Sequence, residues 1–378
     1  MGITRCNYIA MHLHLVSFNV PYPPDYGGII DVFYKIKALH DAGVKIHLHC
    51  FNYGRRMAGE ISQYCVSVNY YQRKLQFHKQ FSLIPFIVYT RNSKELIENL
   101  NRDNYPIIFE GLHCTHPLYI NKFDDRKIVI RTHNIEHDYY KGLAKSEKNL
   151  LKKIYFWFEA FKLKHYEPIL RKATAIAAIS PNDKDYFKTI NPQTSLILPF
   201  HPFSAVSSKI GCGSYILIHG DLSVPENIQS VIWLLENIIP QCPYPFKIAG
   251  KEPSKQIYRS AYSLKNVEII PNPNDSKITD LIENAQINIV HSLYPQGFKL
   301  KLLHVLYKGR HCICNEDVVQ NTGLEPICHI ANTSQEFIST IKHLMLVDLT
   351  YEMVDMRISM LSRFSNQNQI GKLLELIS

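Results

Sequence analysis

The chain has 378 residues, of which 46% are hydrophobic and 20% are charged, a composition typical of a folded protein with two domains of ordinary size. No run approaches the ~20 apolar residues that a transmembrane helix needs, and residues 1–7 lack the apolar segment of a secretory signal. The net charge of +9 suits an anionic partner, but no nucleic-acid-binding motif accompanies it, so we expect no nucleic-acid ligand.

Apolar runs alternate with amphipathic stretches along the first half of the chain, which predicts an α/β domain with a parallel sheet. The predicted elements are strands over residues 9–18, 44–51, 107–110, 127–131 and 173–180, and helices over 29–42 and from 181 onward. Residues 22–28 are a predicted tight loop between the first strand and the first helix.

A second series of the same kind begins near residue 213. Its predicted strands cover residues 214–220, 246–250, 267–270, 287–290 and the apolar run after Gly309, with helices over 225–239 and from Lys299 to Gly309. The proline-containing stretch between residues 195 and 213 is the best linker. The sequence therefore predicts an α/β protein with an N-terminal domain over 1–200 and a C-terminal domain over 213–378.

Two open sheets joined by one linker predict a cleft, with ligands bound at the carboxyl ends of the strands. Polar or glycine-containing segments follow the predicted strands at residues 19–28, 110–116, 132–137, 180, 220–226, 250–252 and 295–301. We expect the functional site to be built from these segments.

The cysteines and histidines indicate neither a disulfide framework nor a metal site. The nine cysteines form no Cys-x-x-Cys pair, and the 18 histidines form no His-Glu-x-x-His pattern. Reduced thiols in a cytoplasmic protein without a metal ion are the simplest interpretation.

Two lysines near a predicted helix start form the most informative motif. Lys299 and Lys301 follow a turn at Gly297. Because the helix dipole already makes this end positive, lysines are unfavourable there unless an anion binds. Free backbone N–H groups together with ammonium groups favour phosphate. The alternative is an ordinary surface helix with solvated lysines.

This segment resembles the donor-binding motif of GT-B glycosyltransferases, especially the retaining family-four (group 1) enzymes. The matching residues are Gly297, Phe298, Lys299, Lys301 and Gly309, whereas Gln296 and His304 stand where the family has glutamates. The resemblance implies two Rossmann-like domains facing a central cleft, with the last helix able to pack back on the N-terminal domain. It also implies transfer of a hexose-type sugar from a nucleotide diphosphate sugar, with retention and without a metal or other cofactor.

The resemblance assigns roles to this segment. Lys299 and Lys301 would neutralise the leaving diphosphate, and Gln296, Gly297 and His304 would contact the donor.

Two segments of the first half also match the family. The Pro-x-x-x-Gly-Gly loop would place Gly28 beside the donor phosphates and Gly27 beside the acceptor, and its alternative is a plain strand-to-helix turn. In the family's His-Asn-x-Glu segment, His133 would line the sugar pocket as a catalytic residue, with Asn134 and Glu136 on the acceptor side. The alternatives are a histidine satisfied within its loop and a glutamate that caps the following helix.

Two loops of the second half resemble those that open the family's donor domain. Gly220 precedes Pro225, and Glu226 is inserted before the asparagine of the motif. No basic residue stands between residues 220 and 228, so Lys251, in a Gly-x-x-Pro turn, is a further donor-binding candidate. Ordinary turns are the alternative for both loops.

Residues 150–166 combine aromatic residues with lysines. From residue 141 to 172 there are nine Lys or Arg and three Asp or Glu, a net charge of +6. A helix with this composition suits an anionic membrane surface on the inner face of the cytoplasmic membrane. The alternative is a core helix with lysines at its rim.

We therefore expect a glycosyltransferase that acts on a glycan or lipid-linked acceptor in cell-surface polysaccharide or glycoconjugate synthesis. Two alternatives stay open at this point. One is a GT-B sugar-nucleotide epimerase, and the other is a non-catalytic GT-B relative that acts as a membrane-associated partner of a glycan assembly complex.

Overall fold

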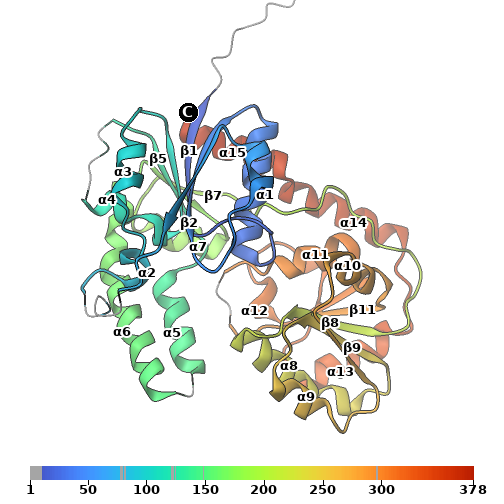
Figure 1. Ribbon diagram of the computed structural model, residues 1–378. Coiled ribbons are helices and arrows are strands. Elements are labelled where there is room, and N and C mark those ends of the chain that lie inside the picture. The colour runs from blue at the N-terminus through green and yellow to red at the C-terminus, as the bar shows by residue number, and fades with distance from the viewer. Residues whose placement is uncertain are drawn as a thin grey trace, which may run out of the picture. The chain divides into compact units, whose positions relative to one another are not determined.

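The computed structural model describes residues 11–76, 80, 82–120, 123, 125–147, 149–294 and 297–378. The chain divides into two compact units (Figure 1). The N-terminal unit consists of Met1–Pro202 together with Phe364–Ser378, and the C-terminal unit is Phe203–Arg363.

The N-terminal unit is built on a seven-stranded, all-parallel sheet in the order β3-β2-β1-β4-β5-β6-β7. Its strands are β1 (His12–Ser17), β2 (Lys45–Asn52), β3 (Ser67–Gln72), β4 (Ile107–Glu110), β5 (Ile128–Arg131), β6 (Ala175–Ala178) and β7 (Thr194–Leu196). Its helices are α1 (Gly27–Asp41), α2 (Phe86–Tyr89), α3 (Lys94–Leu100), α4 (His116–Ile120), α5 (Glu136–Ser146), α6 (Leu150–Tyr166), α7 (Pro181–Lys188) and α15 (Asn366–Ile377).

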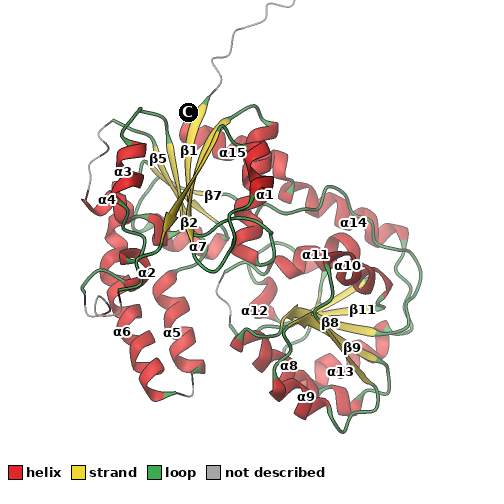
Figure 2. Ribbon diagram, in the orientation of Figure 1, coloured by secondary structure: helices red, strands yellow, loops and turns green. Residues whose placement is uncertain are grey.

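Alternation of side chains along the strands gives this sheet two buried faces (Figure 2). On β1, Leu13 and Leu15 pack against apolar residues of α1 and α15. Val16 packs on the other face, against residues of α3, α6 and α7. The end of the chain is part of this core, because the Gln369 side chain of α15 accepts a hydrogen bond from the Leu198 N–H at 2.8 Å.

The C-terminal unit is built on a six-stranded, all-parallel sheet in the order β10-β9-β8-β11-β12-β13. Its strands are β8 (Ile216–Asp221), β9 (Phe246–Lys251), β10 (Val267–Pro271), β11 (Ile287–Val290), β12 (His311–Cys314) and β13 (His329–Ile330). Its helices are α8 (Pro225–Asn237), α9 (Lys255–Ala261), α10 (Asp275–Asn284), α11 (Leu300–Lys308), α12 (Glu316–Val319), α13 (Ser334–Leu344) and α14 (Tyr351–Leu361). Helices α8 and α13 cover one face of the sheet, and α10 packs on the other.

The α/β fold class predicted from the sequence is confirmed, with several differences in detail. Strand β3 was not predicted; it lies at the edge of the sheet, and most of its residues are half-buried. Strand β7 extends to Leu196, into the predicted linker. Helix α11 begins at Leu300, so Lys299 occupies its N-cap position rather than its first turn. Among the helices of the described residues, none combines the length and apolar character that spanning a membrane requires.

Candidate functional site

The predicted lysine motif lies at the carboxyl edge of the C-terminal sheet, where α11 begins. The Lys301 ammonium is 3.3 Å from Asn227 Oδ1 and 3.4 Å from the His291 carbonyl oxygen. Among the described residues, no carboxylate lies within ion-pair distance of it. Burial, with a contribution from nearby Lys299, lowers the pKa of Lys301 to about 8. Lys301 is therefore a partly desolvated cation that is held by neutral oxygens only.

Lys299 has a different electrostatic environment. Its ammonium lies 2.8 Å from Glu226 Oε1, and the Ser292 hydroxyl donates to the same oxygen at 2.6 Å. Glu226, at the start of α8, thus supplies the counter-charge of Lys299. The sequence identified Glu226 only as an insertion in a loop, and its pairing with a residue 73 positions away could not be read from the motif.

His304 lies one turn further along α11, in apolar surroundings. Its Nε2 is 3.3 Å from the Thr279 hydroxyl, and its ring is tilted against Phe203 with centroids 4.8 Å apart. Burial lowers the pKa of His304 to about 4, so the imidazole is neutral at physiological pH. A neutral imidazole offers one acceptor where a carboxylate would offer two oxygens.

His219, near the end of β8, is a candidate that the sequence reasoning missed. Its ring lies edge-on to His304 with centroids 6.0 Å apart. The residue is 7% exposed, and neither ring nitrogen has a hydrogen-bond partner. Since buried polar atoms are rarely left unpaired, a ligand group is a natural partner for these nitrogens. Its only sequence signal was its place at a strand end.

The glycines of this unit explain how its loops approach one another. A Cβ at Gly250 would lie 1.8 Å from the Gly220 carbonyl oxygen, so the ends of β8 and β9 require glycine at residue 250. Gly297 has φ of +68°, a left-handed conformation that favours glycine.

Lys251 ends β9 with an exposed side chain. The predicted donor residue Gln296 lies outside the described residues.

The start of α1 lies at the carboxyl edge of the N-terminal sheet, and the first N–H groups of a helix have no partner within the helix itself. Its N-cap residue, Tyr26, makes no side-chain cap, and the first turn contains no acidic residue. Gly27 and Gly28 are the first two residues of the helix. A Cβ at Gly28 would lie 3.1 Å from the Phe18 ring, so glycine keeps this approach open. The arrangement suits an anionic or hydroxyl ligand group.

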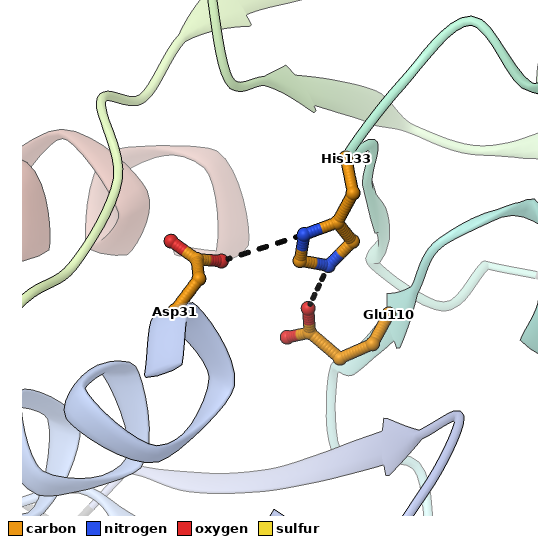
Figure 3. Close-up of side chains that lie close together, drawn as sticks. All are labelled: Asp31, Glu110 and His133. Carbon is orange, nitrogen blue, oxygen red and sulfur yellow. Dashed lines mark hydrogen bonds and ion pairs between the residues drawn. The ribbon is translucent and has the colours of Figure 1, made fainter. Parts of the chain in front are cut away.

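His133 belongs to a buried ion network that also contains Asp31, Lys35, Glu110 and Arg131. Figure 3 shows His133 between Asp31 and Glu110. His133 Nε2 lies 3.0 Å from Glu110 Oε2, and its Nδ1 lies 4.0 Å from Asp31 Oδ2. Lys35 bridges the two carboxylates at 3.0 and 2.7 Å, and Arg131 pairs with Asp31 at 2.9 Å. Both ring nitrogens of His133 therefore face carboxylates, which orients the ring.

The charges of this network explain its protonation. Burial alone would raise the pKa of Asp31, but Arg131 and Lys35 hold it well below its usual range. Burial alone would also raise the pKa of Glu110, but Lys35 and the hydrogen bond with His133 outweigh burial, so this pKa is lowered as well. Both carboxylates are thus ionised and already neutralised. Although one atom each of Asp31, Glu110 and His133 lies within 4.8 Å of the others, this charge balance does not fit a divalent cation.

Glu136, predicted on the acceptor side, is the first residue of α5 and is 4% exposed. Its Oε1 has no hydrogen-bond partner and lies 3.8 Å from His113 Nδ1. Burial raises the pKa of Glu136 to about 8, so its carboxyl is largely protonated at neutral pH. The helix N-cap is Ile135 rather than Glu136. The neighbouring Asn134 is half-buried.

Comparison with known proteins adds a relative and a set of structural neighbours. A protein of Klebsiella pneumoniae, described as an uncharacterized 44.6 kDa protein in the cps region, is 26% identical over 331 residues, 82% of this chain and 84% of its own length. No protein-family model matches the chain.

Solved structures resemble the chain over nearly its whole length. A sucrose-phosphate synthase from Thermosynechococcus elongatus superposes with a TM-score of 0.69 at 14% identity, covering 97% of this chain and 98% of its own. TarM of S. aureus, in a complex with fondaparinux, alpha-GlcNAc-glycerol and UDP, gives 0.67 at 10% identity, with 97% and 100% covered. The chain has the GT-B fold of glycosyltransferases. At these identities the likeness establishes the fold alone.

A third GT-B structure, the E. coli protein described as trehalose-6-phosphate bound with UDP-2-fluoro glucose, gives a TM-score of 0.66 at 10% identity, covering 97% of this chain and 99% of its own. Within the GT-B fold of the present chain, the predicted site residues form two groups, one at the carboxyl edge of each sheet. Lys301 and His304 belong to the C-terminal unit, together with the newly found His219, whereas His133 and Glu136 belong to the N-terminal unit.

Proposed function

We propose that this GT-B protein is a glycosyltransferase that takes a sugar from a nucleotide diphosphate sugar and transfers it, with retention, to a glycan or lipid-linked acceptor. The observation that carries the proposal is the buried Lys301 ammonium at the start of α11, which has neutral oxygens as its hydrogen-bond partners and forms no ion pair within the described residues. The GT-B fold and the relative in a cps region support a role in cell-surface polysaccharide or glycoconjugate synthesis.

The donor would bind in the C-terminal unit. Its diphosphate would meet the Lys301 ammonium and the backbone N–H groups at the start of α11, beside the turn at Gly297. As the bond to the sugar breaks, negative charge grows on the leaving diphosphate, and a preorganised cation lowers the barrier. Lys301 would supply this charge without a metal ion, so turnover should survive a chelator.

Lys299 would contribute less than the sequence suggests. Its charge is already balanced by Glu226, so in the donor complex it would have to exchange this partner for a phosphate. We propose that Lys299 positions the start of α8 against the start of α11.

In the N-terminal unit, His133 would line the sugar site as the resemblance implies. Because its ring nitrogens face Glu110 and Asp31, we propose that the network fixes its orientation before substrate binds. Gly28, with the free N–H groups at the start of α1, would contact donor or acceptor oxygens.

Helix α6 supplies the argument for a peripheral membrane location. Six of its large apolar residues are 43–78% exposed: Leu150, Leu151, Ile154, Trp157, Phe158 and Phe161. Spacings of three, four and seven residues place them on one face of the helix, and α6 packs alongside α5 (Figure 1). With the surrounding net charge of +6, this face suits an anionic lipid surface, where a lipid-linked acceptor would be available.

The second candidate is a non-catalytic relative, and one observation favours it. His304 brings a neutral imidazole to a position where the related enzymes have a glutamate. Release of nucleotide from donor, measured with and without acceptor, tests the choice. Acceptor-dependent release supports the transferase, conversion of donor without acceptor indicates the epimerase, and no binding of any nucleotide sugar at millimolar concentration would leave the non-catalytic role.

A further inference from the structure

Two arginines of the N-terminal unit lie near the carboxyl edge of its sheet and have no assigned role. Arg73 directly follows β3. Arg91 lies just beyond α2 and donates from Nε to the Phe18 carbonyl oxygen at 3.1 Å, which places it at the carboxyl end of β1. Arg91 is 5% exposed. They lie on the same edge as the candidate acceptor residue Glu136.

Among the residues that the structure describes, the hydrogen bonds of these two guanidinium groups go to neutral oxygens. Arg73 donates from Nε and Nη2 to the Thr90 hydroxyl at 3.2 and 3.0 Å and lies over the Tyr53 ring, 4.3 Å from its centroid. Arg91 donates from Nη1 to the Ile87 carbonyl oxygen at 2.6 Å. Within the described part of the chain, no carboxylate reaches ion-pair distance of either arginine.

The two charges also act on each other. Burial lowers the pKa of Arg91 to about 10, and Arg73 contributes to this shift. A pair of desolvated like charges without a counter-ion is unfavourable. A bound anion would relieve both the desolvation and the repulsion.

Unpartnered polar atoms lie beside the arginines. Oε1 of Glu136 and Nδ1 of His113 are buried, 3.8 Å apart and without hydrogen-bond partners. The His113 ring lies against Phe18, with centroids 5.6 Å apart, and the carbonyl of Phe18 holds Arg91. A protonated Glu136 carboxyl can donate a hydrogen bond to an oxyanion, so it is compatible with an anionic ligand.

We propose that Arg73 and Arg91 form an anion subsite for a phosphate or diphosphate group of the acceptor, with Glu136 and His113 completing its polar lining. The assignment of the anion to an acceptor rests on the proposed function. The binding of an anion by the two arginines does not depend on that function. Guanidinium groups are suited to phosphate because their planar forks match its oxygens bidentately. Tyr140 of α5 and Tyr155 of α6 lie within electrostatic range of Arg73, so the subsite is connected to the hairpin that carries the exposed apolar face.

The test is calorimetric titration with inorganic pyrophosphate at constant ionic strength, using Lys301→Ala to remove the proposed donor-phosphate site. In this background, Arg73→Gln should weaken pyrophosphate binding at least about tenfold, since it removes charge-assisted hydrogen bonds. The matched control is Arg102→Gln, which removes an exposed arginine elsewhere in the same unit and should leave affinity unchanged. Arg91→Lys should keep the fold and the charge but lose several-fold affinity.

Equal pyrophosphate affinity in Arg73→Gln and Arg102→Gln would overturn the subsite. Failure of the proposed function would give a different result. In that case, replacing Lys301 by alanine in the otherwise native chain would leave UDP binding unchanged. A prenyl diphosphate in detergent micelles is the second probe. Tighter binding than pyrophosphate assigns the subsite to a lipid-linked acceptor, and equal binding assigns it to a water-soluble phosphate.

Discussion

Replacing Lys301 by alanine tests the central element of the proposed donor site. Within the described residues, the ammonium has the Asn227 amide oxygen and the His291 carbonyl oxygen as its hydrogen-bond partners, so the change leaves no carboxylate there without its ion pair. Loss of a charge-assisted hydrogen bond to phosphate costs about 1.5–3 kcal/mol. UDP is a suitable probe, because one structural neighbour is bound to UDP and another to UDP-2-fluoro glucose. We therefore expect the dissociation constant for UDP to rise roughly 10- to 150-fold.

The pH dependence sharpens this prediction. The pKa of Lys301 in the unliganded protein is about 8, and only the protonated form attracts phosphate. Affinity should be constant below that pH and should fall as the pH rises above it, by at most tenfold per unit. Lys301→Arg should keep a flat profile between pH 7 and 9, because arginine stays charged.

Isothermal titration calorimetry measures both effects, and thermal unfolding checks that the variants fold. Lys308→Ala is the matched control, since it removes the other lysine of α11 at the far end of the helix. Unchanged UDP affinity in Lys301→Ala, or a wild-type affinity independent of pH between 7 and 9, would refute the reasoning.

Three further predictions concern other parts of the molecule. His304→Glu should tighten UDP binding about tenfold by restoring a second acceptor oxygen, and weaker binding in titrations would mean that His304 does not face the ribose. Asp31→Asn should lower the free energy of unfolding by about 3–5 kcal/mol, because it leaves two buried cations short of a partner. Chemical denaturation measures this, and exposed Asp41→Asn should cost less than about 1 kcal/mol. Replacing Trp157 and Phe161 by glutamate should abolish co-sedimentation with anionic vesicles. Binding of the wild type to these vesicles should weaken as the salt concentration rises. A wild type that does not bind such vesicles at low salt would contradict the membrane role of α6.

Much of the fold followed from local patterns in the sequence. Strands β4 and β11 were predicted with their observed bounds, because both are four-residue runs buried on two faces. Strand β3 was missed because five of its six residues are not fully buried, so it has no continuous apolar run. Strand β7 has only three residues, too few to show a period.

The predicted site residues were harder to evaluate, because their chemistry depends on partners distant in sequence. The pattern placed Lys299 and Lys301 together as equivalent phosphate ligands. The structure distinguishes them, since Glu226 forms an ion pair with Lys299 at 2.8 Å and lies beyond ion-pair distance of Lys301. In the same way, the pairing of Asp31 with Arg131 spans 100 residues and depends on the order of strands in the sheet. Such partners follow from topology, which a motif does not encode.

Charge compensation is the physical criterion that separates structural from ligand-binding groups here. Asp31 and Arg131 are buried as deeply as any charged residues of the chain, yet they satisfy each other and need no ligand. Lys301 and Arg91 are desolvated, and no carboxylate of the described residues lies within ion-pair distance of either, which costs stability in the unliganded protein. A fold retains such an unpaired charge at low cost only if something else neutralises it during function. On this reasoning a donor phosphate would complete the C-terminal site and an anionic acceptor would complete the proposed N-terminal subsite. Each ligand should then raise the melting temperature of the native protein by binding the cation of its own site.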